Sequence, residues 1–72
     1  MRRGVYTTET VISPVESERA FRIAEECLIE IRFVEMRREN SAWLYEYEVN
    51  GEVGKVNKFV ARLRQVEFKR NK

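Results

Sequence analysis

The chain has 72 residues, with 14 basic residues against 12 acidic residues and a formal net charge of +2. Its single cysteine and its lack of histidine exclude a disulfide within the chain and the usual cysteine and histidine metal sites. No apolar run approaches the roughly 18 residues that span a membrane, and the N-terminus lacks the apolar segment of a signal peptide. We therefore expect a cytoplasmic protein with no membrane partner.

A chain of this length is expected to form one domain, residues 1–72, with a basic tail at 69–72. Such a domain buries only about 60% of the surface that its unfolded form exposes, so its core is marginal. Small domains of this kind rely on disulfides, metals or oligomerisation. Because the first two are excluded, oligomerisation is the expected aid.

The charges are distributed unevenly. Residues 4–52 carry five arginines and eleven glutamates, whereas residues 53–72 carry seven basic residues and only Glu67. An acidic body with a basic C-terminal third is typical of a protein with an acidic or nucleic-acid partner. It is equally consistent with two halves that neutralise each other.

The first two predicted elements are a strand and a helix. Residues 3–12 are rich in β-branched and aromatic types, which favours a strand. Ser13, Pro14 and Glu16 then match a capping box, with serine at the N-cap and proline at the first helical position. The helix is predicted to run to about Leu28, with apolar residues repeating at the helical period.

The next two predicted elements are strands. Residues 29–33 alternate between apolar and charged types, but the phase then slips because Phe33 and Val34 are adjacent. A bulge explains this slip, and so does a strand that passes from a covered to an uncovered part of the sheet. Residues 37–41 are predicted to form a polar turn, and residues 42–49 the strand that follows it.

The last third predicts a second helix. Val53, Val56, Val60 and Leu63 recur at spacings of 3, 4 and 3, and Gly54 weakens the helix by about 1 kcal/mol. Residues 66–69 alternate as a short final strand. A continuation of the helix and a disordered tail remain alternatives for residues 65–72.

The predicted order is β-α-β-β-α-β, an α+β fold with a four-stranded antiparallel sheet and both helices on one face. The element order, length and short links of the whole chain resemble the ferredoxin-like superfold, which hosts many unrelated functions. ACT-type amino-acid-sensing domains are similar in size and order. Residues 12–14 stand where those domains have a glycine-bearing loop, and the resemblance implies a small-molecule sensor.

Neither catalysis nor a cofactor is expected. The chain offers no histidine, and most of its glutamates alternate with basic neighbours at positions expected to be exposed. Ser13 is interpreted as a helix cap and Cys27 as a core residue of the first helix. We therefore predict a protein that is not an enzyme.

An aromatic stripe on the strand 42–49 has two interpretations. Trp43, Tyr45 and Tyr47 share one face and could stack RNA bases, as in RNA-recognition sheets. That orientation would turn Glu46 and Glu48 into the core, which is costly for unpaired carboxylates. We therefore assign the stripe to the core.

Two surfaces remain as candidates. A basic set suits contact with nucleic acid or an acidic partner; it comprises Arg37, Arg38, Lys55, Lys58, Arg62, Lys69 and Arg70. An open sheet face is predicted either to be solvated and ion-paired or to form a dimer seam; it includes Thr8, Thr10, Arg32, Leu44 and Glu46.

The leading hypothesis is a small non-enzymatic interaction, assembly or regulatory module that self-associates through its sheet. Its predicted partner is a second copy or another protein. The alternative is an RNA-binding protein that uses the basic second helix, the C-terminal tail and Arg37-Arg38. An ACT-like small-molecule sensor is the third hypothesis.

Overall fold

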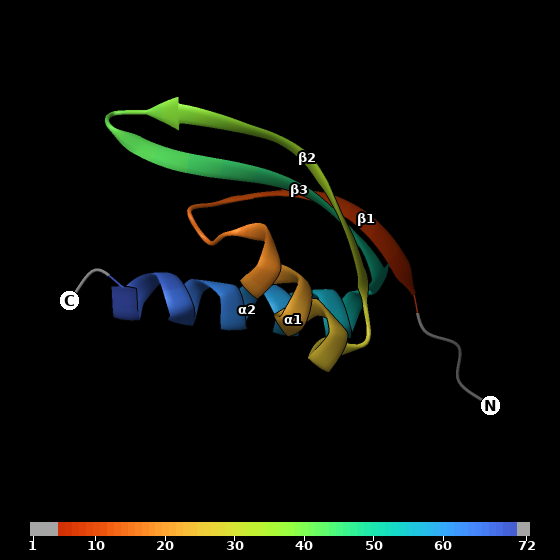
Figure 1. Ribbon diagram of the computed structural model, residues 1–72. Helices are drawn as coiled ribbons and strands as arrows, with labels where there is room; N and C mark the ends of the chain where they lie inside the picture. Colours follow the sequence, from red (N-terminus) through yellow and green to blue (C-terminus); the bar gives the residue numbers. More distant parts are fainter. Residues whose placement is uncertain (1–4, 71–72) are drawn as a thin grey trace.

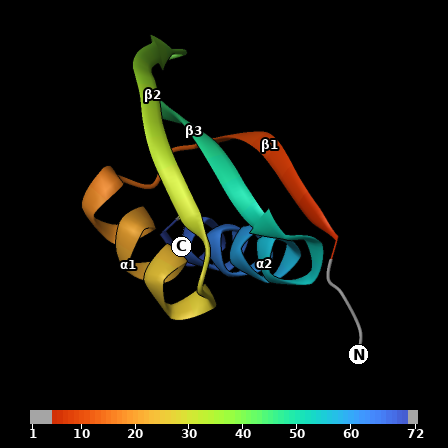
Figure 2. The ribbon, with the colours of Figure 1, turned by 90° about the vertical axis from the view of Figure 1, so that its right-hand side faces the viewer.

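A computed structural model describes residues 5–70 of the chain. The elements are β1 (Tyr6–Ser13), α1 (Ser17–Cys27), β2 (Glu30–Glu39), β3 (Ala42–Glu52) and α2 (Val53–Arg70). The strands form one antiparallel sheet in the order β1-β3-β2, and both helices lie on the same side of it (Figures 1 and 2). The α+β class is confirmed, but the predicted four-stranded sheet is wrong because the described residues form three strands.

The predicted final strand at 66–69 belongs instead to the last turns of α2. Val66 continues the stripe of Val56, Phe59 and Leu63 at the helical period and packs against the core. Alternation over only four residues did not distinguish a strand from a helix here. Residues 69 and 70 of the predicted basic tail end α2, and residues 71 and 72 lie outside the described part of the chain.

The predicted capping box is also wrong. The N-cap of α1 is Glu16, and its side chain makes no capping hydrogen bond. Ser13 is fully buried, and its hydroxyl accepts a hydrogen bond from the Val15 amide at 3.0 Å instead. The serine therefore closes a turn between β1 and α1, and the helix starts three residues after Pro14.

The hairpin of β2 and β3 is longer than predicted. Residues 37–39, assigned to a turn from the sequence, continue β2, and the turn is only Asn40 and Ser41. Both have positive φ angles, 50° and 67°, as the type I′ hairpin turn requires. The phase slip at Phe33 and Val34, for which a bulge was one of two interpretations, coincides with a shift in register between Phe33 and Glu35.

The core lies between the sheet and the two helices. Tyr47 and Val49 are fully buried and Tyr45 packs against the core, as the inward stripe predicted. Trp43 is 49% exposed, so the prediction is wrong at this residue. Close packing also explains Gly51, because a Cβ atom there would meet Ile29 Cγ2 at 2.8 Å.

Strand length explains the exposure of Trp43. The 10 residues of β2 extend roughly 33 Å, whereas the 11 residues of α1 extend roughly 16 Å. β1 also ends early, since its last partner on β3 is Tyr45. The tip of the hairpin therefore projects beyond both β1 and α1, while the C-terminal part of α2 runs below it on the helix side of the sheet (Figure 1).

Candidate interaction surfaces

The inner side of the projecting hairpin tip is the first candidate surface. Met36 pairs with Tyr45 and Arg38 with Trp43, so these side chains share the face on which Phe33 pairs with Tyr47. Phe33, Met36 and Trp43 are 41%, 49% and 49% exposed. We call this surface the hairpin face; it consists of Phe33, Met36, Arg38, Trp43 and Tyr45.

Ring contacts connect the hairpin face to the core. The Tyr45 ring stacks on that of the buried Tyr47 with centroids 6.4 Å apart, and Phe33 lies 6.4 Å from Tyr45. The Arg38 guanidinium lies 5.5 Å from the centre of the Trp43 ring. These contacts connect the exposed aromatic rings to the packed core, and the Arg38 guanidinium lies at the outer end of the group.

The opposite side of the sheet carries the predicted dimer seam. The register places all of its residues on the face away from the helices; they are Thr8, Thr10, Arg32, Leu44 and Glu46. Arg32 pairs with Glu48 at 3.1 Å, and Arg37 pairs with Glu46 at 3.1 Å. This face is therefore rich in ion pairs, and it also carries the exposed Ile12 and the half-buried Leu44.

The predicted basic set is divided among different neighbours. Arg37 and Arg38 lie on opposite faces of β2, because Arg37 pairs in register with Leu44 and Arg38 with Trp43. Arg37 lies within 4 Å of three glutamates.

On α2, Lys55 pairs with Glu52 at 3.9 Å and Arg62 with Glu26 at 2.5 Å. Within residues 5–70, Lys58 and Lys69 have no ion-pair partner. The side chain of Arg70 lies outside the described part of the structure. The members of the set whose side chains are described thus do not form one unneutralised basic patch.

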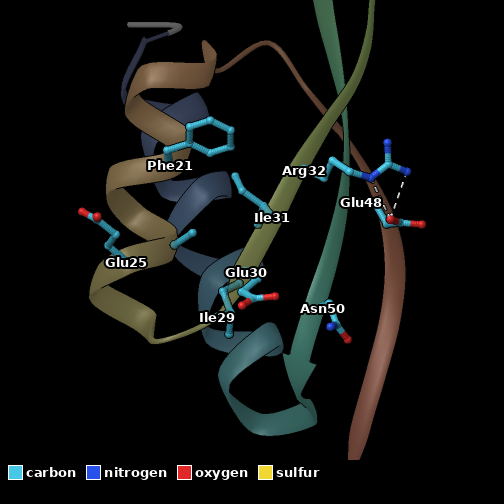
Figure 3. Close-up of a pocket in the computed structure, with 9 residues that line it drawn as sticks. Phe21, Glu25, Ile29, Glu30, Ile31, Arg32, Glu48 and Asn50 are labelled. Atoms are coloured by element: carbon cyan, nitrogen blue, oxygen red, sulfur yellow. Dashed lines mark hydrogen bonds and ion pairs between the residues drawn. The ribbon is translucent and has the colours of Figure 1, made fainter.

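A shallow groove of about 600 Å³ runs between α1 and the start of β2 (Figure 3). Phe21 and Ile31 supply apolar walls, while Glu25 and Glu30 lie at its rim. Its only basic side chain, Arg32, is paired with Glu48. An excess of carboxylates makes this groove unfavourable for phosphate groups.

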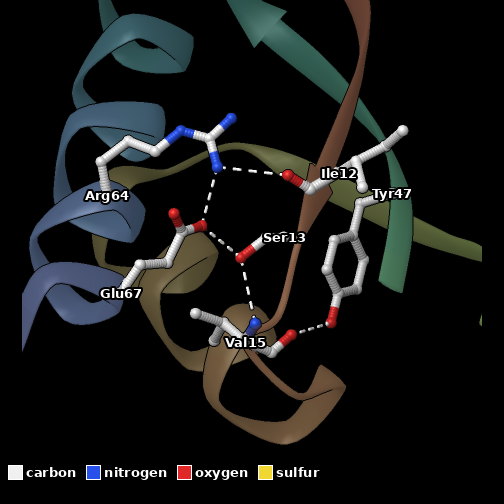
Figure 4. Close-up of polar contacts among 6 residues, drawn as sticks. All are labelled: Ile12, Ser13, Val15, Tyr47, Arg64 and Glu67. Atoms are coloured by element: carbon white, nitrogen blue, oxygen red, sulfur yellow. Dashed lines mark hydrogen bonds and ion pairs between the residues drawn. The ribbon is translucent and has the colours of Figure 1, made fainter. Parts of the chain in front are cut away.

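A partly buried polar network joins β1 to α2 (Figure 4). The Ser13 hydroxyl donates to Glu67 at 2.5 Å, and Arg64 donates both to Glu67 at 2.7 Å and to the Ile12 carbonyl at 3.2 Å. Since Ser13 is fully buried and both of its hydrogen-bonding functions are used, it has a structural role.

Tyr47 supports the same corner. Its hydroxyl donates to the Val15 carbonyl at 2.7 Å. Burial raises the pKa of the Tyr47 hydroxyl, an effect that its hydrogen bond with Ser17 partly offsets.

Metal binding, thiol chemistry and membrane insertion were each considered for the described residues. Within residues 5–70 no group of three or more acidic, histidine or cysteine side chains could hold a metal ion. Cys27 is a buried free thiol. Neither α1 nor α2, over the described chain, is long and apolar enough to cross a membrane.

The hairpin face was missed by sequence reasoning because the aromatic stripe was assigned to the core as a whole. One signal could have identified it. The phase slip at Phe33 and Val34 had a second interpretation, a strand passing onto an uncovered part of the sheet, and β2 does so.

Comparison with protein-family models, with curated proteins and with solved structures found no significant match for this chain. The functional argument therefore depends on its own surfaces.

Proposed function

We propose that this chain is a small non-enzymatic protein-interaction module that binds partner proteins, including its own copies, through its sheet. One observation carries the proposal: the hairpin face is mainly apolar and aromatic, and its Phe33, Met36 and Trp43 side chains are 41–49% exposed. Single exposed apolar side chains are common, but a contiguous group supported by the core marks an interaction site.

The size of the hairpin face supports this function. A large aromatic side chain buries about 150–250 Å² when it is fully covered, and Phe33 and Trp43 are nearly half exposed. Together with Met36 and Tyr45 they offer a few hundred Å², the scale of functional patches on monomers. A stable complex buries about 800 Å² on each partner, so a second surface must contribute as well.

The chemistry of the face favours a protein over other partners. Aromatic residues, methionine and arginine are the types enriched at protein interfaces. A reducing, cytoplasmic location is part of the proposal and is supported by the buried free thiol of Cys27. The absence of enzymatic activity is also part of the proposal, and the buried, structural position of Ser13 supports it.

RNA binding is the second candidate, and one observation favours it. Arg38 and the exposed Trp43 lie together on a sheet face, and nucleic-acid proteins stack bases on such groups. The three glutamates around Arg37 weaken this proposal, because they offset the charge that phosphate contact needs.

Sedimentation equilibrium of the full chain tests the proposal, combined with titration of single-stranded RNA at low salt. We expect concentration-dependent association and no RNA binding. A strictly monomeric protein at millimolar concentration that binds RNA with a steep salt dependence would replace the leading proposal with the second one.

A further inference from the structure

β1 forms an edge of the described sheet and carries few of the features that protect such edges. Within residues 5–70 its only neighbouring strand is β3, and the register between the two strands is regular over all 8 residues. The strand contains one charged residue, Glu9, and no proline. Natural proteins protect exposed edges with charges, prolines or bulges, because an open edge pairs with other chains.

One hydrogen bond indicates which backbone groups face the open side. Arg64 Nη1 donates to the Ile12 carbonyl at 3.2 Å, so this carbonyl turns away from β3 toward α2 (Figure 4). In an antiparallel strand every second residue directs its N–H and C=O groups to the same side. Tyr6, Thr8 and Thr10 therefore direct theirs to the open side, where no strand of the described chain pairs with them.

The same arginine places an apolar part of α2 on this side of the molecule. A surface hollow of about 490 Å³ is lined by Arg64 together with Ala61 and Phe68. Phe68 is 73% exposed, among the highest values of the large apolar residues. A neighbour along β1 would cover both the strand edge and this flank of α2.

Charge complementarity points to a second copy as that neighbour. Glu9 is exposed and has no ion-pair partner within residues 5–70, and on α2 Lys58 and Lys69, of which Lys69 lines the same hollow, also have none there. Two copies placed side by side bring Glu9 of each copy toward α2 of the other. Repulsion between the two helices is reduced because Arg64 is already paired with Glu67 at 2.7 Å.

We propose that two copies pair antiparallel along β1, centred on Thr8, so that their two three-stranded sheets become one continuous sheet. This proposal rests on the proposed function and names the surface through which copies associate. Tyr6 then pairs with Thr10 of the second copy, and Thr8 with its own equivalent. The Ile12 carbonyl stays bound to Arg64, and no two glutamates face each other, as they would in a register centred on Glu9.

The two-fold symmetry of this pairing closes the assembly as a dimer. The hairpin face stays outside the contact, because β1 ends opposite Tyr45, two residues from Trp43 on β3. Each copy therefore keeps its hairpin face available for a different protein. Trp43 is the only tryptophan, and its emission reports whether that face becomes covered.

The test is sedimentation equilibrium with tryptophan emission recorded at the same concentrations. The wild-type chain is expected to dimerise without a shift in emission. Thr8→Lys and Thr8→Glu each place like charges opposite one another at the centre of the contact, so each should raise the dimer dissociation constant about tenfold or more. An equimolar mixture of the two variants should recover the wild-type affinity, which also shows that both variants fold.

Leu44→Glu is the matched control, since Leu44 lies on the outer sheet face beside Arg37 and away from β1. It should dimerise as the wild type does. Wild-type affinity of both Thr8 variants, an emission shift on dimerisation, or loss of the dimer in Leu44→Glu would each overturn the β1 contact while leaving self-association intact. A wild-type chain that stays monomeric at every concentration would instead overturn self-association itself.

Discussion

The two edges of the sheet are built differently. β2 carries six charged residues among its 10, a bulge, and exposed ion pairs such as Arg32 with Glu48. β1 carries one charge and a regular register, and a partly buried network attaches its C-terminal end to α2. Each of these two strands pairs with β3 alone in the described sheet, so both are edge strands.

This difference indicates that the β2 edge is protected against pairing and the β1 edge is not. Charges and a bulge make strand addition unfavourable at β2. At β1 the structure instead fixes the strand end and leaves its middle open. The same edge of the sheet is therefore attached to α2 at its C-terminal end and open to pairing along its middle.

The largest expected effect on stability is at the β1 attachment. Ser13→Ala removes the acceptor of the Val15 amide and the donor to Glu67, and should lower the free energy of unfolding by about 2 kcal/mol. Urea denaturation measures this change, with Thr10→Ala as an exposed control on the same strand. Equal, small effects of the two substitutions would show that the network adds nothing.

Tyr47→Phe should have the next largest effect, about 1 kcal/mol, because the buried Val15 carbonyl loses its donor. The raised pKa of the Tyr47 hydroxyl also makes the stability of the wild-type chain depend on pH. Above about pH 10 the unfolded chain releases the tyrosine proton while the folded chain retains it, so stability falls as the pH rises. Denaturation from pH 8 to 11 should therefore show a smaller fall for Tyr47→Phe, and parallel curves would contradict this assignment.

Trp43→Ser tests the projecting tip on the β2 side. Because Trp43 is half exposed and contacts Arg38, stability should fall by less than about 1 kcal/mol. The dimer should be unchanged by sedimentation. A loss of more than about 3 kcal/mol, typical of a buried tryptophan, would mean that the tip is covered in solution.

The smallest expected effect is at the charges that protect β2. Arg37→Ala removes ion pairs to exposed or partly exposed carboxylates and should change stability by about 0.5 kcal/mol or less. Thermal unfolding at low and high salt measures it. A large, salt-insensitive loss would show that this cluster holds the hairpin together as the Ser13 network holds β1.

Local patterns of the sequence predicted much of this fold. The spacing of Val56 and Leu63 predicted a helix, and the adjacent Phe33 and Val34 indicated an irregularity in the second strand. Tyr47 was correctly placed in the core because the glutamates beside it had to face outward. Each of these inferences needed only the period of a single element.

Several of the errors depend on contacts between distant elements. Ser13 was predicted to cap the first helix, but its hydroxyl donates to Glu67, which lies 54 residues later in the sequence. The predicted strand at 66–69 was wrong for a local reason, because alternation over four residues also fits the helical stripe that Val66 continues. The exposure of Trp43 depends on how far the hairpin extends beyond the end of α1. The open edge of β1 can be recognised only once the strand order is known.

Amide hydrogen exchange measured at several protein concentrations tests the central claim most directly. The backbone amides of Thr8 and Thr10 should exchange more slowly as concentration rises, because a second copy binds them, while amides along β2 should show no dependence on concentration. Exchange at Thr8 and Thr10 that is independent of concentration, or protection that grows along β2 instead, would contradict the account.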